Sequence, residues 1–177
     1  MQKVEALVGS QVYLRLLNAS DVSMDYVSWL NDVDVNRYLE SRHVEQTYES
    51  CKIFVNQAVS RTDTLLFGIF CNQSNLHIGN IKLGPISERY NRATLGLMIG
   101  DKKYWGRGIA REIINLITTF SKDELGLNKI EAGCYCTNKG SEKAFLREGY
   151  QIEGLLRNHV VLDGEYEDCI LLGKILN

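Results

Sequence analysis

The chain has 177 residues, of which 45% are hydrophobic and 24% charged, and this length suits one compact domain with a sizeable core. Its 20 basic and 22 acidic residues give a formal net charge of -2, so no overall basic field exists to hold nucleic acid or an anionic membrane surface. An anionic ligand would have to be held by a local feature of the fold.

In the first half of the chain, cap and turn residues separate short periodic segments. Ser20 and Thr47 offer N-caps, and the turn-rich residues 71–75 favour an antiparallel hairpin between the strands on either side. The elements expected here are a strand over 12–16, a helical stretch from Ser20 to about Glu40 in two pieces, a helix from Thr47 to about Ser60, and strands over 64–70, 77–83 and 91–99.

In the second half, apolar residues fall at helical spacing after Gly106, so one helix face is expected to pack on the sheet. These residues are Ala110, Ile113, Ile114, Ile117 and Phe120. This helix should end near Gly126, before a strand over 128–136, a helix over 138–148, and strands over 150–161 and 165–175. The order predicts an α+β fold with a mixed, mostly antiparallel sheet of about seven strands and helices on both faces.

Residues 1–9 lack an apolar segment of signal-peptide length, and the apolar runs elsewhere are too short to cross a bilayer. We therefore expect a single cytoplasmic domain over residues 1–177 that contacts neither membrane nor nucleic acid. The five cysteines are an odd number at irregular spacing, which argues against a disulfide framework. Cys134 and Cys136 have no second Cys/His cluster beside them, so they are expected to be small buried hydrophobes, and no metal is expected.

Residues 103–110 join the end of a strand to the start of the amphipathic helix, and their glycines let backbone amides approach a ligand. Successive N–H groups and the positive end of the helix dipole would bind a pyrophosphate, and Arg107 would add a direct charge. A tight turn without a ligand is the alternative interpretation. Arg111 stands where a dinucleotide fingerprint needs its third glycine, and the Gly-Lys-Ser/Thr of a P-loop is missing.

The pattern Lys103-x-x-Gly106-x-Gly108 resembles the coenzyme A pyrophosphate signature of the GCN5-related N-acetyltransferase (GNAT) family, Gln/Arg-x-x-Gly-x-Gly/Ala, with Lys in the first place. A second block resembles the family's Asn-x-x-Ser/Ala followed by Gly-Phe/Tyr, and consists of Asn138, Ser141, Phe145, Gly149 and Tyr150. Residues 29–32, 78–81 and 164–168 are similar to the subgroup that includes ribosomal-protein alanine acetyltransferases and amino-sugar acetyltransferases.

This resemblance implies a single GNAT-like domain in which the fourth strand, here 94–99, carries a bulge and splays from the fifth, here 129–136. Acetyl-coenzyme A is the implied co-substrate, and its pantetheine would lie in the splay. The implied coenzyme-binding residues are Leu97, Met98, Ile99, Lys103, Gly106, Arg107, Gly108, Ile109, Ala110, Asn138 and Phe145.

Asn138 and Ser141 are the catalytic residues that the resemblance implies. Asn138 would bind the coenzyme or a catalytic water, although it could simply cap its helix. Many relatives carry a proton-donating Tyr where this chain has Phe145, so Ser141 is the nearest hydroxyl by motif; a helix-start role is its alternative. The general base stays open, because many relatives carry an acidic residue where this chain has Thr94. The remaining candidates are His43, His77, His159, Glu40, Glu131 and Glu153.

In this family the first two helices form a wall of the acceptor pocket, which here points to Trp29, Asp32, Tyr38 and Glu40. Carboxylates there suit a cationic acceptor, although an ordinary solvated helix face would look the same. A nucleotide-sugar acceptor would want basic and aromatic groups, such as Arg37, Arg42 and Tyr38. A ribosomal protein would want a broad acidic surface.

The sequence therefore predicts an acetyl-CoA-dependent N-acetyltransferase that acts on a primary amine by direct attack, as a monomer or homodimer. An amino-sugar nucleotide and the N-terminal alanine of a peptide are both open as acceptors. The competing hypothesis is a non-catalytic acyl-CoA-binding sensor, which Phe145 and Thr94 would favour.

Overall fold

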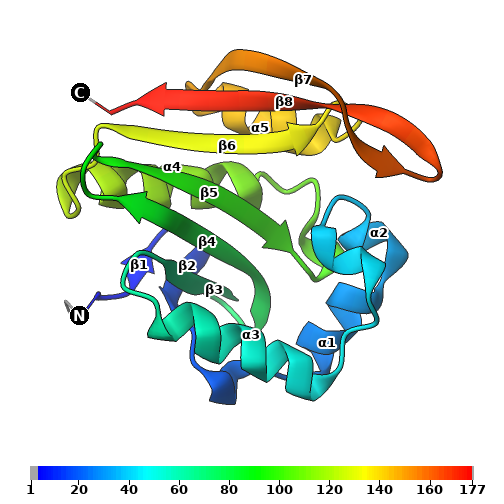
Figure 1. The fold of residues 1–177 in the computed structure, drawn as a ribbon. Coiled ribbons are helices and arrows are strands. Elements are labelled where there is room, and N and C mark those ends of the chain that lie inside the picture. Colours follow the sequence, from blue (N-terminus) through cyan, green and yellow to red (C-terminus); the bar gives the residue numbers. More distant parts are fainter. Residues whose placement is uncertain (1–3, 177) are drawn as a thin grey trace.

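The computed structural model describes residues 4–176, which form one eight-stranded sheet in the order β1-β2-β3-β4-β5-β6-β8-β7 (Figure 1). The strands are β1 Leu7–Val8, β2 Val12–Leu16, β3 Leu65–Cys71, β4 His77–Ser87, β5 Arg92–Ile99, β6 Lys129–Tyr135, β7 Gln151–Leu162 and β8 Glu165–Ile175. Neighbouring strands are antiparallel except β5 and β6. The predicted α+β fold is confirmed, with one strand more than expected because β1 is too short to show an alternating pattern.

The sheet carries helices on both faces, as expected. The helices are α1 Met24–Asn31, α2 Val33–Asn36, α3 Tyr48–Ser60, α4 Ile109–Asp123 and α5 Lys139–Arg147, with short 3-10 turns η1 Ala19–Asp21, η2 Glu40–His43 and η3 Lys102–Tyr104. Within residues 4–176, no helix is long and apolar enough to cross a membrane.

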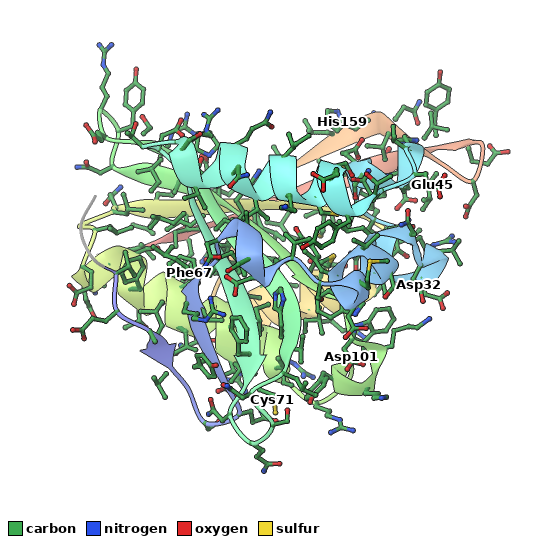
Figure 2. All side chains as sticks on the ribbon, turned by 90° about the horizontal axis from the view of Figure 1, so that it is seen from below. Asp32, Glu45, Phe67, Cys71, Asp101 and His159 are labelled. Carbon is green, nitrogen blue, oxygen red and sulfur yellow. The ribbon has the colours of Figure 1, made fainter. Side chains whose placement is uncertain are left out.

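Side-chain alternation along β3 separates two apolar cores. Leu66 and Phe70 pack with residues of α1 and α3 on one face, whereas Phe67 and Ile69 pack with α4 on the other. Phe67 lies in the interior and meets Phe120 of α4 edge to face, with ring centroids 5.9 Å apart (Figure 2). The helical spacing noted in the sequence thus places α4 under the centre of the sheet.

The first helical stretch differs from its prediction at its start. Asn18 caps η1, so Ser20 lies inside that turn, and α1 begins instead after Ser23, whose hydroxyl accepts from the Tyr26 amide at 3.1 Å. Asp32 then ends α1 and caps α2. The other predicted cap is present, since the Thr47 hydroxyl accepts from an amide in the first turn of α3.

The sheet opens between β5 and β6. Their parallel pairing runs from Arg92 opposite Lys129 to Leu95 opposite Ala132 and then ends, and the two strands diverge (Figure 1). This is the splay that the sequence predicts. The expected bulge is not in β5: the irregularity of the β4–β5 ladder falls at residues 84–85 of β4, where Pro85 has no amide hydrogen to donate.

Candidate active site

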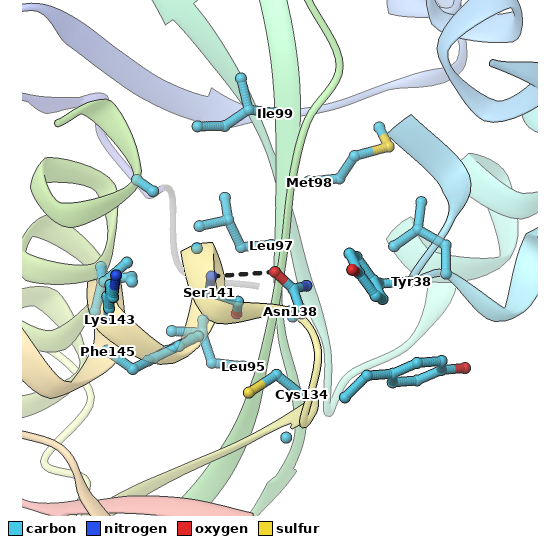
Figure 3. Close-up of a pocket in the computed structure, with 18 of the residues that line it drawn as sticks. Tyr38, Leu95, Leu97, Met98, Ile99, Cys134, Asn138, Ser141, Lys143 and Phe145 are labelled. Atoms are coloured by element: carbon cyan, nitrogen blue, oxygen red, sulfur yellow. Dashed lines mark hydrogen bonds between the residues drawn. The ribbon is translucent and has the colours of Figure 1, made fainter. Parts of the chain in front are cut away.

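A cavity of about 1080 Å³ occupies the splay and reaches both faces of the sheet. Its walls come from β5 and β6, from the N-terminal part of α4 and the loop before it, from the length of α5, and from α2, η2, β7 and β8. In Figure 3, the β5 residues Leu97 and Met98 lie between α5 on one side and Tyr38 on the other. One end of the cavity is therefore formed by α4 and α5, and the opposite end by α2 and η2.

The loop before α4 combines two left-handed glycines with a helix N-terminus. Gly106 has φ 71° and Gly108, the N-cap of α4, has φ 79°. A Cβ added to either glycine would meet no atom within 4 Å, so packing does not require these glycines. The positive φ is what requires glycine at these two positions. The space beside them is open, in front of the amides that begin a 15-residue helix. This arrangement suits an anion such as a pyrophosphate.

The loop is held to the sheet by side-chain hydrogen bonds. The Trp105 indole donates to the carbonyl of Ile99 at 2.8 Å, and the Asp101 carboxylate accepts from the Lys103 amide at 3.0 Å. Lys103 and Arg107 are exposed and are not among the residues that line the cavity. The loop is thus anchored independently of any ligand.

Three basic residues that the motif did not indicate line the same end of the cavity: Arg111, Lys143 and Arg147. Arg111 forms an ion pair with Glu148, while Lys143 and Arg147 are exposed on α5. Two signals were available in the sequence: Arg111 follows the glycine loop directly, and Lys143 and Arg147 are four residues apart in one helix. They add positive charge where the helix dipole is already positive.

Residues 96–99 of β5 pair with β4 on one edge, but on the other edge they do not pair with β6. Leu97, Met98 and Ile99 line the cavity there, as does Gly96, whose added Cβ would again meet nothing within 4 Å. A free strand edge pairs readily with an extended molecule that carries amide groups.

Asn138 caps α5, and its Oδ1 accepts from the Ser141 amide at 3.2 Å (Figure 3). The cap predicted as the alternative role is therefore present, and the amide Nδ2 is the group left for a ligand. Ser141 lies beside the Cys134 thiol, whose pKa burial raises to about 11. Phe145 is buried against Tyr150, with ring centroids 4.9 Å apart. Asn138, Ser141 and Phe145 all line the cavity.

At the opposite end, Tyr38 and Glu40 line the cavity as predicted. The Tyr135 hydroxyl donates to Glu40, and the Arg42 guanidinium donates to the same hydroxyl at 2.8 Å. The hydrogen bond from Tyr135 holds the pKa of Glu40 below its usual value. Burial and the Glu40 carboxylate raise the pKa of Tyr135 to about 12.

Trp29 and Asp32 lie behind this wall and do not line the cavity. Trp29 packs on the backbone of Gly100 and meets the His77 ring edge to face, at a centroid distance of 5.3 Å. Asp32 caps α2 and pairs with Lys102 at 2.7 Å. Both residues fix α1 and α2 against the end of β5.

Two of the six residues considered as a general base, Glu40 and His159, line the cavity. His77 is in the core, where its Nε2 lies 2.9 Å from the Gly79 carbonyl and burial lowers its pKa. Glu131 and Glu153 both pair with Lys129, and His43 is exposed.

Sequence reasoning missed the part of the wall that comes from β6, β7 and β8. These residues are Gly133, Cys134, Tyr135, Leu156, Val160, Cys169 and Leu171. Tyr135 and Cys169 are partners in the β6–β8 ladder, so their place on one face follows from strand register. No local motif marks that register.

A family model described as an acetyltransferase (GNAT) domain matches residues 11–151. An uncharacterized N-acetyltransferase of Bacillus subtilis is 25% identical over 156 residues, covering 87% of each chain. A spermidine N(1)-acetyltransferase of Vibrio cholerae is 27% identical, over 96% of this chain and 98% of that one. A solved ribosomal L7/L12 alpha-N-protein acetyltransferase in complex with coenzyme A superposes with a TM-score of 0.87 at 19% identity, covering 97% of this chain and 98% of that one.

Proposed function

The chain belongs to the GNAT acetyltransferase family, and from that premise we propose that it transfers the acetyl group of acetyl-coenzyme A to a primary amine in the cavity between β5 and β6. One observation carries the proposal: the glycine loop before α4 and the free edge of β5 open into the same cavity. Coenzyme A needs both features, because its pyrophosphate is an anion and its pantetheine carries two amides.

The residues at the α4 end fit the coenzyme. The amides from Gly106 to Ala110 would hold the pyrophosphate, and Lys143 and Arg147, which have no ion-pair partner among the described residues, would hold the remaining phosphate charge. The backbone of Leu97, Met98 and Ile99 would pair with the pantetheine. Lys103 and Arg107, both exposed beside this loop, would contribute long-range attraction to the anion.

We infer direct transfer without an acyl-enzyme. The neutral amine nitrogen attacks the thioester carbonyl carbon, the C–S bond breaks, the amine loses a proton and the departing thiolate gains one. A backbone amide of residues 97–99 would polarise the carbonyl. Ser141 would return the proton to the thiolate, and Asn138 would bind the coenzyme through Nδ2 or order a water.

Glu40 and His159 are the two base candidates that line the cavity. Either residue would take the proton from the amine directly or through a water. Glu40 is the weaker base of the pair, since a carboxylate whose pKa is lowered binds a proton less readily. This favours His159 as the proton acceptor.

An amino-sugar nucleotide and the N-terminal alanine of a peptide are the acceptors proposed from the sequence. One relative is named a spermidine N(1)-acetyltransferase, and one structural neighbour is named a ribosomal L7/L12 alpha-N-protein acetyltransferase. Arg37 pairs with Asp163, and Arg42 donates to Tyr135 and to the Val161 carbonyl, so the cations that a nucleotide would need are already engaged. This favours an acceptor without phosphate.

The test is acetyl-CoA turnover with a panel of primary amines. Turnover is measured as release of the free thiol, and mass spectrometry identifies the acetylated amine. We expect thiol release that depends on the amine. Tight binding of acetyl-CoA with no turnover on any amine would instead support the acyl-CoA sensor, which the Phe145 and Thr94 positions favour.

A further inference from the structure

The charged residues of the cavity wall are divided between its two ends. Arg111, Lys143 and Arg147 all come from α4 and α5, whereas the two carboxylates, Asp34 and Glu40, both come from α2 and η2. Opposite charges at the ends of one cavity orient a bound pair of ligands of opposite charge. The basic end suits the phosphates of the coenzyme, so the acidic end faces the acceptor.

Asp34 and Glu40 each keep one oxygen without a hydrogen-bond donor among the described residues, and Glu40 is the one that Tyr135 and Arg42 hold in place. Asp34 pairs with Lys102 at 3.0 Å. In Glu40, Oε1 accepts from Tyr135 and lies 3.5 Å from Arg42, while Oε2 lies 3.8 Å from the His43 Nε2. The Glu40 side chain is 74% exposed but that of Arg42 only 12%, so Arg42 supports the carboxylate from behind.

Hydrogen bonds of Arg42 and Tyr135 hold Glu40 in this position. Arg42 donates to the Leu39 carbonyl at 2.8 Å, to the Tyr135 hydroxyl at 2.8 Å and to the Val161 carbonyl at 2.9 Å, which ties η2 to β6 and β7. The Tyr135 ring is 6% exposed and meets Tyr38 edge to face at 5.6 Å. A carboxylate fixed in advance loses less conformational entropy when it binds a cation.

The surroundings of Glu40 are apolar and aromatic. Leu39, Leu156 and Val160 line the cavity together with the rings of Tyr38 and Tyr135. Such a wall suits the hydrocarbon spacer of an acceptor.

We propose that Glu40, held by Tyr135 and Arg42, anchors a positive charge of the acceptor other than the reacting amine, so that the acceptor is a di- or polycationic amine. The inference rests on the proposed acetyl transfer. The reacting nitrogen must be neutral to attack, whereas a carboxylate stabilises the protonated form of any amine beside it. Glu40 is therefore better placed on a second ammonium, and its lowered pKa keeps it ionised for that role.

The experiment compares acceptors that differ by one charge. Butane-1,4-diamine is set against butylamine, and the amide of alanyl-lysine against that of alanyl-norleucine, with kcat/KM measured for the wild type and for Glu40→Gln. We expect the wild type to prefer the dicationic member of at least one pair by about tenfold, the size of one partly desolvated charge-assisted hydrogen bond. Glu40→Gln should remove that preference, lowering kcat/KM about tenfold more for the dication than for the monocation. The pair in which the preference depends on Glu40 shows whether the acceptor is a diamine or a peptide.

The matched control is Glu45→Gln, which changes an exposed carboxylate outside the cavity wall (Figure 2). It should keep the wild-type preference. Equal rates for both members of each pair, or a preference that survives Glu40→Gln, would overturn the inference while leaving acetyl transfer intact. If the wild type acetylates no amine, the proposed function fails. Calorimetry then measures binding of the four amines to the protein–coenzyme A complex. Binding of a dication that is lost in Glu40→Gln would support the inference, and no such binding would refute it.

Discussion

The two ends of the cavity are built in different ways. At the α4 end, the ligand groups are backbone amides set by Gly106 and Gly108 within one continuous segment. At the η2 end, the groups are the side chains of Glu40, Arg42 and Tyr135, which come from segments more than ninety residues apart. The first end depends on local conformation, and the second depends on the register of the whole sheet.

This difference teaches what each end contributes. A cradle of backbone amides binds a feature that every acyl-coenzyme A shares, and it tolerates changes in neighbouring side chains. An end made from side chains is specific to one acceptor and sensitive to single substitutions. We therefore propose that the α4 end binds the coenzyme and that the η2 end selects the amine.

The largest expected effect is loss of measurable coenzyme binding in Gly108→Val. A branched side chain would enter the open space in front of the loop and disfavour φ 79°, at a cost of roughly 1–2 kcal/mol in stability. Titration calorimetry with acetyl-CoA measures the first effect, and thermal melting the second.

The matched control is Gly126→Val, at the far end of α4. Gly126 has φ 61° and equally open surroundings but does not line the cavity. It should cost similar stability and leave coenzyme affinity unchanged. Folded Gly108→Val protein with wild-type affinity would place the coenzyme elsewhere.

Acetyl-CoA itself should stabilise the protein. A ligand that binds only the folded state adds about 2.7 kcal/mol at a hundredfold excess over Kd. For a domain of this size that is about 5–10 °C in Tm, measured by calorimetry or dye-based melting. NAD and ATP should raise Tm much less, because the loop lacks their fingerprints. An unchanged Tm at millimolar acetyl-CoA would count against the α4 end as a coenzyme site.

Ser141→Ala should lower kcat about a hundredfold and leave the KM for acetyl-CoA nearly unchanged, because a general acid acts only on the departing thiolate. The hundredfold figure is the low end for such groups, since a thiolate is a fairly good leaving group. Ser50→Ala is the matched control: Ser50 occupies the same position in the first turn of α3. A kcat within about twofold of wild type would leave Ser141 as a helix-start residue.

The smallest expected effect is that of Tyr135→Phe, which keeps the ring but removes the hydroxyl that links Arg42 to Glu40. We expect the KM of the preferred acceptor to rise about three- to tenfold with kcat little changed, because only the position of Glu40 is loosened. Tyr150→Phe, which removes a buried hydroxyl bonded to Thr118 at 3.0 Å, should lower stability without this effect on KM. A fall in kcat alone would instead give Tyr135 a direct role in proton transfer.

The sequence predicts most of the fold and the α4 end of the site. The helical spacing of Ile113, Ile114 and Ile117, and the glycines of the loop, are local signals with a direct physical meaning. The predicted start of the first helix at Ser20 was wrong, because Asn18 caps the turn η1 and Ser23 caps α1. Two neighbouring polar residues offered the same bond, and spacing alone does not choose between them.

The η2 end was predicted only in part. Tyr38 and Glu40 followed from the family resemblance, but nothing in the chain marks Tyr135 as their partner. Its position depends on the pairing of β6 with β8, a contact between segments distant in sequence. Trp29 and Asp32 carry the same kind of signal as Glu40 yet lie behind the wall. Which face of a short helix meets the cavity is decided by packing against β5.

A crystal structure with coenzyme A and butane-1,4-diamine, or with the amide of alanyl-lysine if kinetics favour it, tests the division of the cavity most directly. The pyrophosphate is expected at hydrogen-bond distance from the amides of residues 106–110, with the pantetheine along residues 96–99 and one ammonium on Glu40. A coenzyme bound away from the α4 loop, or both ammonium groups bound away from Glu40, would contradict the account.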